Sequence, residues 1–272
     1  AFEDSRSIRV GGDEPQVLRF KHAIVATGSL PSRLLGLDVE SERIMDSTAA
    51  LEVPEIPERL LVIGGGYIGL ELGQVYAALG SRVTVVEMTD GLLPGADRDL
   101  VQPLARRCEK LFAAIHLKSK VTTLKESASV VEVSIEGHPP QSFDRVLVAV
   151  GRRAVSYGLG LETTKVKFSE RGVISVDERG RTADPYLYAV GDVTGDPMLA
   201  HRAMRQGKIA AEVIAGWPSA FDNAAVPAVV FTDPEVAWCG LMEAEALSKG
   251  RAVRVAKFPW AASGRAATIG RS

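Results

Sequence analysis

The sequence predicts an α/β fold built around a Rossmann-like β–α–β unit. Residues 60–63 form a short, unbroken apolar run, which is typical of a strand buried on both faces of a parallel sheet. Apolar side chains then recur at helical spacing until Gly80, a residue type favoured at helix C-termini. Residues 82–87 form a second strand that ends in an acid. The helix between the strands is expected to bury a face made of Leu72, Val75, Tyr76 and Leu79.

The turn between the first strand and the helix has the pattern Gly64-x-Gly66-x-x-Gly69. In this pattern the first glycine permits a tight turn, the second lets a pyrophosphate approach the backbone, and the third lets helix and strand pack closely. The helix N-terminus offers free N–H groups and the positive end of its dipole to phosphates. The pattern therefore predicts a dinucleotide site; the alternative is a glycine-rich turn that binds nothing.

Glu87 decides between the two common dinucleotides. It follows Gly69 by 18 residues, close to the spacing of about 20 expected for the acid that binds the ribose hydroxyls. Because a carboxylate in this place repels a 2′-phosphate, the sequence favours NAD over NADP.

Composition excludes several other classes of function. The chain has 272 residues and a formal net charge of −2, which does not favour nucleic acid or an anionic membrane as a partner. No apolar run approaches the ~20 residues that span a bilayer. Cys108 and Cys239 form no C-x-x-C motif, so no disulfide framework is expected and the cytoplasm is the expected location. The four scattered histidines predict no metal site.

The flanking segments predict further strands and helices. We expect a hairpin over residues 1–20 that turns at 11–13, and an apolar strand over 21–29. A helix is expected over 97–110, with Leu100, Leu104, Cys108 and Leu111 on its buried face.

Three strand-like runs predict an antiparallel β-meander attached to the parallel sheet; they cover residues 115–124, 129–135 and 143–150. Within the last run, residues 146–150 are expected to run back as an apolar strand of the parallel type. Beyond the meander, strands are expected at 172–177, 187–190 and 229–231, and helices at 198–215 and 243–247.

Two strand ends outside the central unit form a second candidate constellation. Thr27-Gly28-Ser29 and Gly191-Asp192 both follow apolar strands, and open α/β sheets bind ligands at the carboxyl ends of their strands. No helix start is expected after Asp192, so its carboxylate is free for a hydroxyl-rich ligand. The helix that begins near Met198 could hold a polar group on its N–H groups. His201 is either a catalytic base or, with no paired acid in the sequence, a structural histidine.

Several segments carry a resemblance to a known family; they are VIGGGYIGLELG (62–73), VEMTDGLLPGADRDLV (86–101), AVGRR (149–153), YAVGDVTGDPMLAHRA (188–203) and VVFTDPEVAWCGL (229–241). They resemble the dihydrolipoamide dehydrogenases, in particular bacterial forms, within the pyridine nucleotide-disulfide oxidoreductases. The resemblance implies an FAD- and NAD-dependent enzyme that forms a homodimer and reoxidises the lipoyl domains of 2-oxo-acid dehydrogenase complexes.

The resemblance also implies a division into domains. Residues 1–46 and 154–222 would be parts of an FAD-binding domain, 47–153 an inserted NAD-binding domain, and 223–272 the start of an α+β interface domain. A stand-alone NAD-binding module would not need residues 1–46 to pack with 154–222 in one sheet, so this packing distinguishes the two interpretations.

The resemblance implies a role for each matching residue. Along the NAD pyrophosphate and towards the nicotinamide would lie Gly64, Gly65, Gly66, Tyr67, Ile68, Gly69, Leu70 and Glu71. Glu71 would lie near the carboxamide, Glu87 at the adenosine ribose, Val121 against the adenine, and Gly151 at the edge of the pocket. FAD would be contacted by Thr27, Gly28, Ser29, Asp192, Met198, Leu199, Ala200 and His201.

The sequence departs from the family in ways that bear on catalysis. It contains no N-terminal FAD fingerprint, no pair of cysteines with four residues between them, and no C-terminal His and Glu acid–base pair. Ala154-Val-Ser156 and Gln206 also replace the usual residues. We therefore expect this chain to bind NAD, to retain FAD weakly or not at all, and to have no catalytic residue of its own. The alternatives are a related flavoprotein disulfide reductase, a soluble transhydrogenase, or an NAD-binding module.

Overall fold

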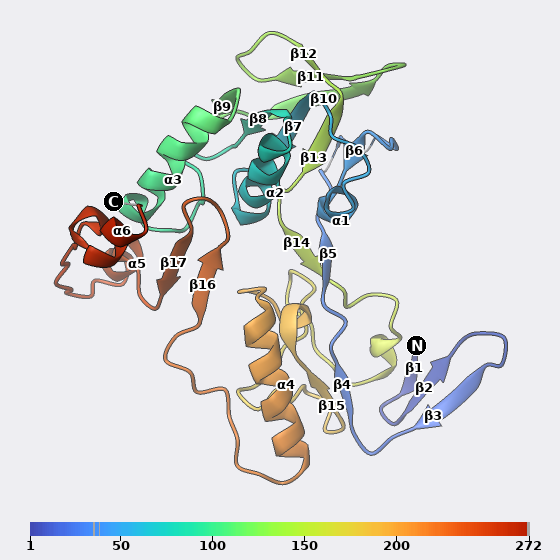
Figure 1. Ribbon diagram of the computed structural model, residues 1–272. Coiled ribbons are helices and arrows are strands. Elements are labelled where there is room, and N and C mark those ends of the chain that lie inside the picture. The colour runs from blue at the N-terminus through green and yellow to red at the C-terminus, as the bar shows by residue number, and fades with distance from the viewer. Residues whose placement is uncertain (35, 38, 271–272) are drawn as a thin grey trace.

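A five-stranded parallel sheet forms the centre of the fold (Figure 1). The computed structural model describes residues 1–34, 36–37 and 39–270. The strands lie in the order β6-β13-β7-β8-β9, with every neighbouring pair parallel. Their bounds are β6 Ile44–Met45, β7 Arg59–Ile63, β8 Arg82–Val86, β9 Ala114–His116 and β13 Arg145–Val148. The predicted parallel sheet and its β–α–β unit are confirmed.

Helices pack on one face of this sheet; they are α1 Ser47–Leu51, α2 Tyr67–Ala78 and α3 Arg98–Leu111. Leu70, Tyr76 and Leu104 are fully buried against the sheet. The predicted buried faces are partly wrong, because Val75, Leu79 and Leu100 are more than two-fifths exposed. Gly69 and Gly73 of α2 are buried, so they bring this helix close to the sheet and turn Val75 and Leu79 towards solvent.

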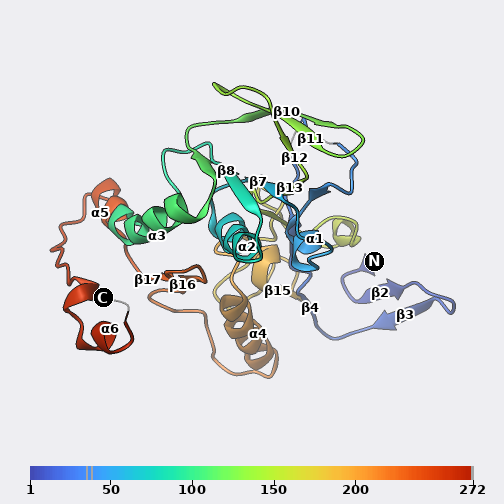
Figure 2. The same cartoon turned by 45° about the horizontal axis from the view of Figure 1, so that its top comes forward.

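A three-stranded antiparallel meander packs on the other face (Figure 2). It consists of β10 Val121–Glu126, β11 Val131–Ile135 and β12 Gln141–Phe143. The prediction of one strand over 115–124 is wrong, because the chain leaves the parallel sheet after β9 and enters the meander at β10. Lys118, with φ of 50°, lies in the break. The run 143–150 is divided between β12 and β13, and the parallel strand expected over 146–150 is confirmed as β13.

A second region pairs segments that lie far apart in the sequence. Strand β4 (Ala23–Val25) pairs in parallel with β15 (Leu187–Ala189), and β5 (Ser29–Pro31) pairs with β14 (Arg152–Ala154). Phe2, Val25, Leu161 and Leu187 belong to one buried cluster here. Strand β4 of residues 1–46 therefore pairs with β15 of residues 154–222, a packing that a stand-alone NAD-binding module would not need.

The remaining elements of this region are a three-stranded antiparallel sheet, two 3-10 turns and one long helix. Their bounds are β1 Phe2–Asp4, β2 Ser7–Val10, β3 Gln16–Arg19, η1 Leu161–Thr163, η2 Gly191–Thr194 and α4 Ala200–Ile214. The hairpin turn at 11–13 and the helix after Met198 are confirmed. A strand at 172–177 is not formed; the segment makes only an isolated bridge between Phe168 and Ile174.

The C-terminal segment docks on α2 and α3. It contains β16 Pro227–Val230, β17 Val236–Cys239, α5 Glu243–Ser248, η3 Trp260–Ala262 and α6 Gly264–Thr268. Val230 and Val236 are buried in the same cluster as the helices of the parallel sheet. The amide of Gln74 accepts the Asp233 N–H at 2.6 Å and donates to the Asp233 carbonyl at 3.1 Å. Among the described residues, no helix is long and apolar enough to cross a bilayer.

Candidate dinucleotide site

The three positions of the turn are occupied by glycine for different physical reasons. A Cβ on Gly64 would lie 2.4 Å from the Ala149 carbonyl oxygen, and a Cβ on Gly69 would lie 2.1 Å from the Gly64 oxygen. Packing of the protein therefore requires these two glycines. A Cβ on Gly66 would meet nothing within 4 Å. Packing therefore does not require glycine here, and its effect is to leave space for a ligand in front of the backbone. This agrees with the predicted approach of a pyrophosphate.

Glu87 points into the turn. Its Oε2 accepts the Gly65 N–H at 2.6 Å and its Oε1 accepts the Thr89 N–H at 2.8 Å, and the residue is only 8% exposed. Gly66 is the N-cap of α2 and makes no side-chain capping bond, so the helix N-terminus keeps N–H groups for a ligand. A carboxylate and a helix N-terminus thus lie on either side of one glycine turn.

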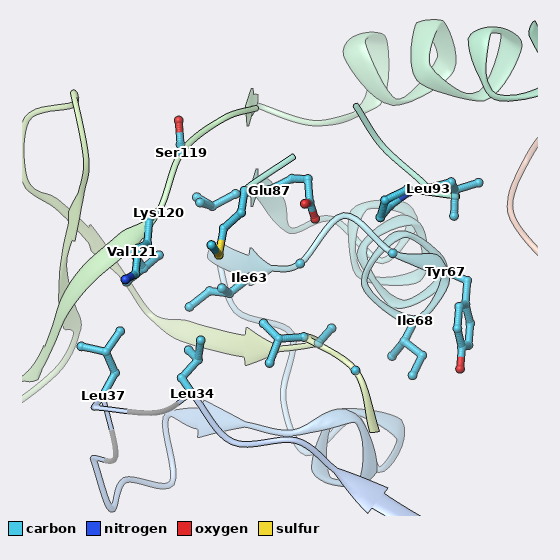
Figure 3. A pocket seen from close by; sticks show the side chains of 18 of the residues that line it. Leu34, Leu37, Ile63, Tyr67, Ile68, Glu87, Leu93, Ser119, Lys120 and Val121 are labelled. Carbon is cyan, nitrogen blue, oxygen red and sulfur yellow. The ribbon is translucent and has the colours of Figure 1, made fainter. Parts of the chain in front are cut away.

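A cavity of about 500 Å³ opens beside this turn (Figure 3). Figure 3 shows Glu87 and Ile63 on one wall, with Val121 and Ser119 across from them. Of the predicted site residues, Gly64, Gly66, Tyr67, Ile68, Glu87, Val121 and Gly151 line the cavity. Gly65 contributes through its bond to Glu87, whereas Leu70 is fully buried beneath the turn.

Several lining residues were not foreseen; they are Leu34, Leu37, Met88, Leu93, Pro94, Ser119, Lys120, Ala149, Val150 and Trp238. Ala149 and Val150 follow the end of β13, so the strand-end rule could have found them. Leu34, Leu37 and Trp238 reach the cavity only through tertiary packing, and no local pattern marks them.

Tyr67 and Glu71 lie on the first turns of α2. Burial raises the pKa of the Tyr67 phenol, and the charges of Arg152 and Asp192 act on that pKa in opposite directions. The phenol is therefore a neutral hydrogen-bonding group between the cavity and the second constellation. The Glu71 carboxylate does not line the cavity; its Oε1 accepts the Phe231 N–H at 2.8 Å.

The second constellation is brought together as a hydrogen-bonded group. Ser29 Oγ donates to Asp192 Oδ2 at 2.6 Å, and Arg152 donates to Ser29 Oγ at 2.7 Å and to the Ser29 carbonyl at 2.9 Å. Thr27 Oγ1 donates to the Val155 carbonyl, and Gly28 has φ of 72°. Contrary to expectation, Asp192 lies inside the 3-10 turn η2. Sequence reasoning gave Arg152 no role.

The start of α4 closes this group. Leu199 is the N-cap of α4, and Ala200 and His201 are its first residues. His201 Nε2 lies 2.8 Å from the Pro227 carbonyl oxygen, which supports the structural interpretation of this histidine. Gln206, one of the departures from the family pattern, accepts the Gly191 N–H at 2.9 Å through its amide oxygen.

The comparison with known families agrees with this geometry. Residues 3–207 match the pyridine nucleotide-disulphide oxidoreductase family, and residues 226–272 match the dimerisation domain of the same enzymes. The chain belongs to the pyridine nucleotide-disulphide oxidoreductase family. The predicted resemblance and the α/β fold class are confirmed, and a dimerisation domain is present in part of the C-terminal segment.

Curated relatives in this family are dihydrolipoyl dehydrogenases. The enzyme of Vibrio parahaemolyticus is 45% identical over 270 residues, which cover 97% of this chain and 57% of that protein. The enzyme of Geobacillus stearothermophilus is 43% identical, with 98% and 58% covered. The chain thus spans somewhat more than half the length of the curated relatives it matches.

Solved structures show the same fold. The HOCl-induced flavoprotein disulfide reductase RclA of Escherichia coli matches with a TM-score of 0.89 at 29% identity, covering 98% of this chain and 62% of that chain. LpdA of Mycobacterium tuberculosis matches with a TM-score of 0.88 at 27% identity, with 96% and 58% covered.

Proposed function

We propose that this chain is the NAD-binding part of a dihydrolipoyl dehydrogenase, the enzyme that reoxidises dihydrolipoamide with NAD. The position of Glu87 against the glycine turn carries the proposal. The 45% identity with dihydrolipoyl dehydrogenases supports the reaction, and the boundaries predicted for the four domains belong to the same proposal.

The residues around the turn fit a dinucleotide. The open space at Gly66 and the uncapped start of α2 suit a pyrophosphate, because both present N–H groups without side-chain obstruction. Glu87 would accept hydrogen bonds from the ribose hydroxyls, and Val121 would form an apolar wall for the adenine. NAD supplies the hydride acceptor in this chemistry and FAD relays two electrons.

The second constellation is proposed to face FAD. The bond from Ser29 fixes one oxygen of the Asp192 carboxylate and leaves the other oxygen for a ligand hydroxyl. Arg152 holds Ser29 from β14, so the strand that leaves the NAD unit also orders this group. The N–H groups of Leu199, Ala200 and His201 would hold a polar edge of the same cofactor.

A nucleotide titration tests the proposal. Isothermal titration should give tighter binding of NAD than of NADP, and Glu87→Gln should remove most of this preference, because the repulsion of the 2′-phosphate is lost. Asp90→Asn, an exposed acid in the following loop, should leave the preference unchanged. Equal affinity for the two nucleotides in the unmodified chain would instead favour a related disulfide reductase or a transhydrogenase.

We also propose that this chain alone does not turn over dihydrolipoamide. Its two cysteines are both free, with Cys108 buried in α3 and Cys239 exposed on β17. A dihydrolipoamide-dependent NAD reduction assay should therefore show no turnover by the purified chain. In the full enzyme the partners would be a second copy and the lipoyl domains of a 2-oxo-acid dehydrogenase complex in the cytoplasm.

A further inference from the structure

A second cavity, of about 290 Å³, lies at the amino ends of the parallel strands, whereas the dinucleotide site lies at their carboxyl ends. It opens between the sheet and the meander, where Arg59 starts β7 and Arg82 starts β8. The two arginines are paired directly in the β-ladder, so they lie side by side at the amino ends of their strands. The dinucleotide turn follows the carboxyl end of β7, so the two sites are separate.

Like charges directly opposite each other on neighbouring strands destabilise a sheet, and only one of these arginines has a counter-ion. Arg59 lies 3.4 Å from an oxygen of Asp144. Among the described residues, the Arg82 guanidinium has no ion pair or hydrogen bond. The exposed guanidinium of Arg82 is therefore available to an anion at the mouth of the cavity.

The neutral polar side chains of the lining also make no hydrogen bond among the described residues. Thr84 is only 6% exposed, yet its hydroxyl has no hydrogen-bond partner in the part of the chain that the structure describes. The side chains of Gln141 and Ser142, from β12, are likewise without partners there. The guanidinium of Arg82 and these three neutral side chains therefore keep their hydrogen-bonding groups available to a ligand in the cavity.

We propose that this cavity binds a phosphate group. Its polar lining consists of guanidinium, hydroxyl and amide groups, and no described carboxylate lines it. An arginine fork matches the oxygens of a phosphate, and the neutral groups can donate to the remaining oxygens. The cavity is at the lower end of the range for small-molecule sites, roughly 300 Å³, so it suits free phosphate or a small phosphomonoester. Nothing in this inference depends on NAD binding.

A residue-level titration tests the site. Inorganic phosphate is added to the ¹⁵N-labelled chain at constant ionic strength, with chloride as the balancing anion. The amide signals of Arg82, Thr84 and Ser142 should move together with a single dissociation constant. The titration is then repeated with glycerol 3-phosphate. A lower dissociation constant for this compound than for inorganic phosphate indicates a phosphomonoester as the ligand, and the reverse indicates free phosphate.

Variants assign the binding to this cavity. Arg82→Gln should weaken binding by about tenfold or more, since a charge-assisted bond is lost, and Thr84→Val should weaken it by a smaller factor while keeping the side-chain shape. Arg106→Gln removes an exposed arginine on α3 and should change nothing. Movement confined to residues 64–69, or binding that is unaffected in Arg82→Gln, would overturn the proposal. Both variants are checked for an unchanged pattern of amide signals elsewhere.

Discussion

Gly69 on α2 packs against the carbonyl of Gly64 so closely that a Cβ at position 69 would lie 2.1 Å from that oxygen. The obstacle is backbone, so the helix would have to move away from β7. Gly69→Ala should therefore lower the free energy of unfolding by about 1–3 kcal/mol, as overpacking of a close contact does. Urea unfolding measures this change.

Gly66→Ala is the matched control. A Cβ at position 66 meets nothing within 4 Å, and the backbone there is extended at φ of −77°. The free energy of unfolding should stay within about 1 kcal/mol of the original value, while NAD affinity falls because the methyl group occupies the space of the pyrophosphate. If both variants lost stability equally, the turn would be a packing feature without a ligand role.

The β–α–β unit could be predicted from the sequence because close contacts of the backbone require its glycines. Gly69 is fixed by a contact with Gly64 within one β–α–β unit, and Glu87 directly follows the second strand, β8. The split of residues 115–124 could not be predicted, because an apolar run looks the same whether it serves one sheet or two. Trp238 reaches the cavity from the dimerisation segment, and no spacing in the sequence encodes that approach.

Two hydrogen bonds between Gln74 and the Asp233 backbone attach the C-terminal segment to α2. Gln74 is 8% exposed, and both ends of its amide are used by the Asp233 backbone. Gln74→Ala removes two hydrogen bonds to the Asp233 backbone, which costs about 1–3 kcal/mol. Hydrogen exchange at the Asp233 amide should accelerate strongly, and proteases should cut residues 226–240 sooner. Gln102→Ala, an exposed glutamine on α3, should have neither effect.

The two cysteines should react at very different rates. Burial raises the pKa of the Cys108 thiol, and the residue is fully buried, so little thiolate is available to attack a reagent. Cys239 is exposed. A maleimide should label one thiol quickly in the folded chain and the second only after unfolding. Cys239→Ser should abolish the fast phase; a persistent fast phase would show that Cys108 is accessible.

The rings of His116 and His138 predict an acid sensitivity. Their centroids lie 4.0 Å apart, and His116 Nε2 is buried without a hydrogen-bond partner among the described residues. Burial lowers the pKa of His116, and the adjacent His138 lowers it further. The unfolded chain therefore takes up a proton near pH ~6.5, while the folded chain does not until the pH is lower.

It follows that the stabilisation from neutral His116 is complete above pH ~6.5 and is lost as the pH falls towards the folded pKa. Within that window the free energy of unfolding should fall by up to about 1.4 kcal/mol per pH unit for this one group. His116→Leu should flatten the slope, measured by urea unfolding at several pH values, because it removes the titrating ring and keeps an apolar side chain on β9. His22→Gln, at a histidine whose ring meets Tyr188 edge to face in the other region, should leave the slope as it was. A slope unchanged by His116→Leu would assign the acid sensitivity to the carboxylates instead. The backbone carbonyl of His116 also accepts the Glu87 N–H at 2.9 Å, but this bond does not titrate and is kept in the variant.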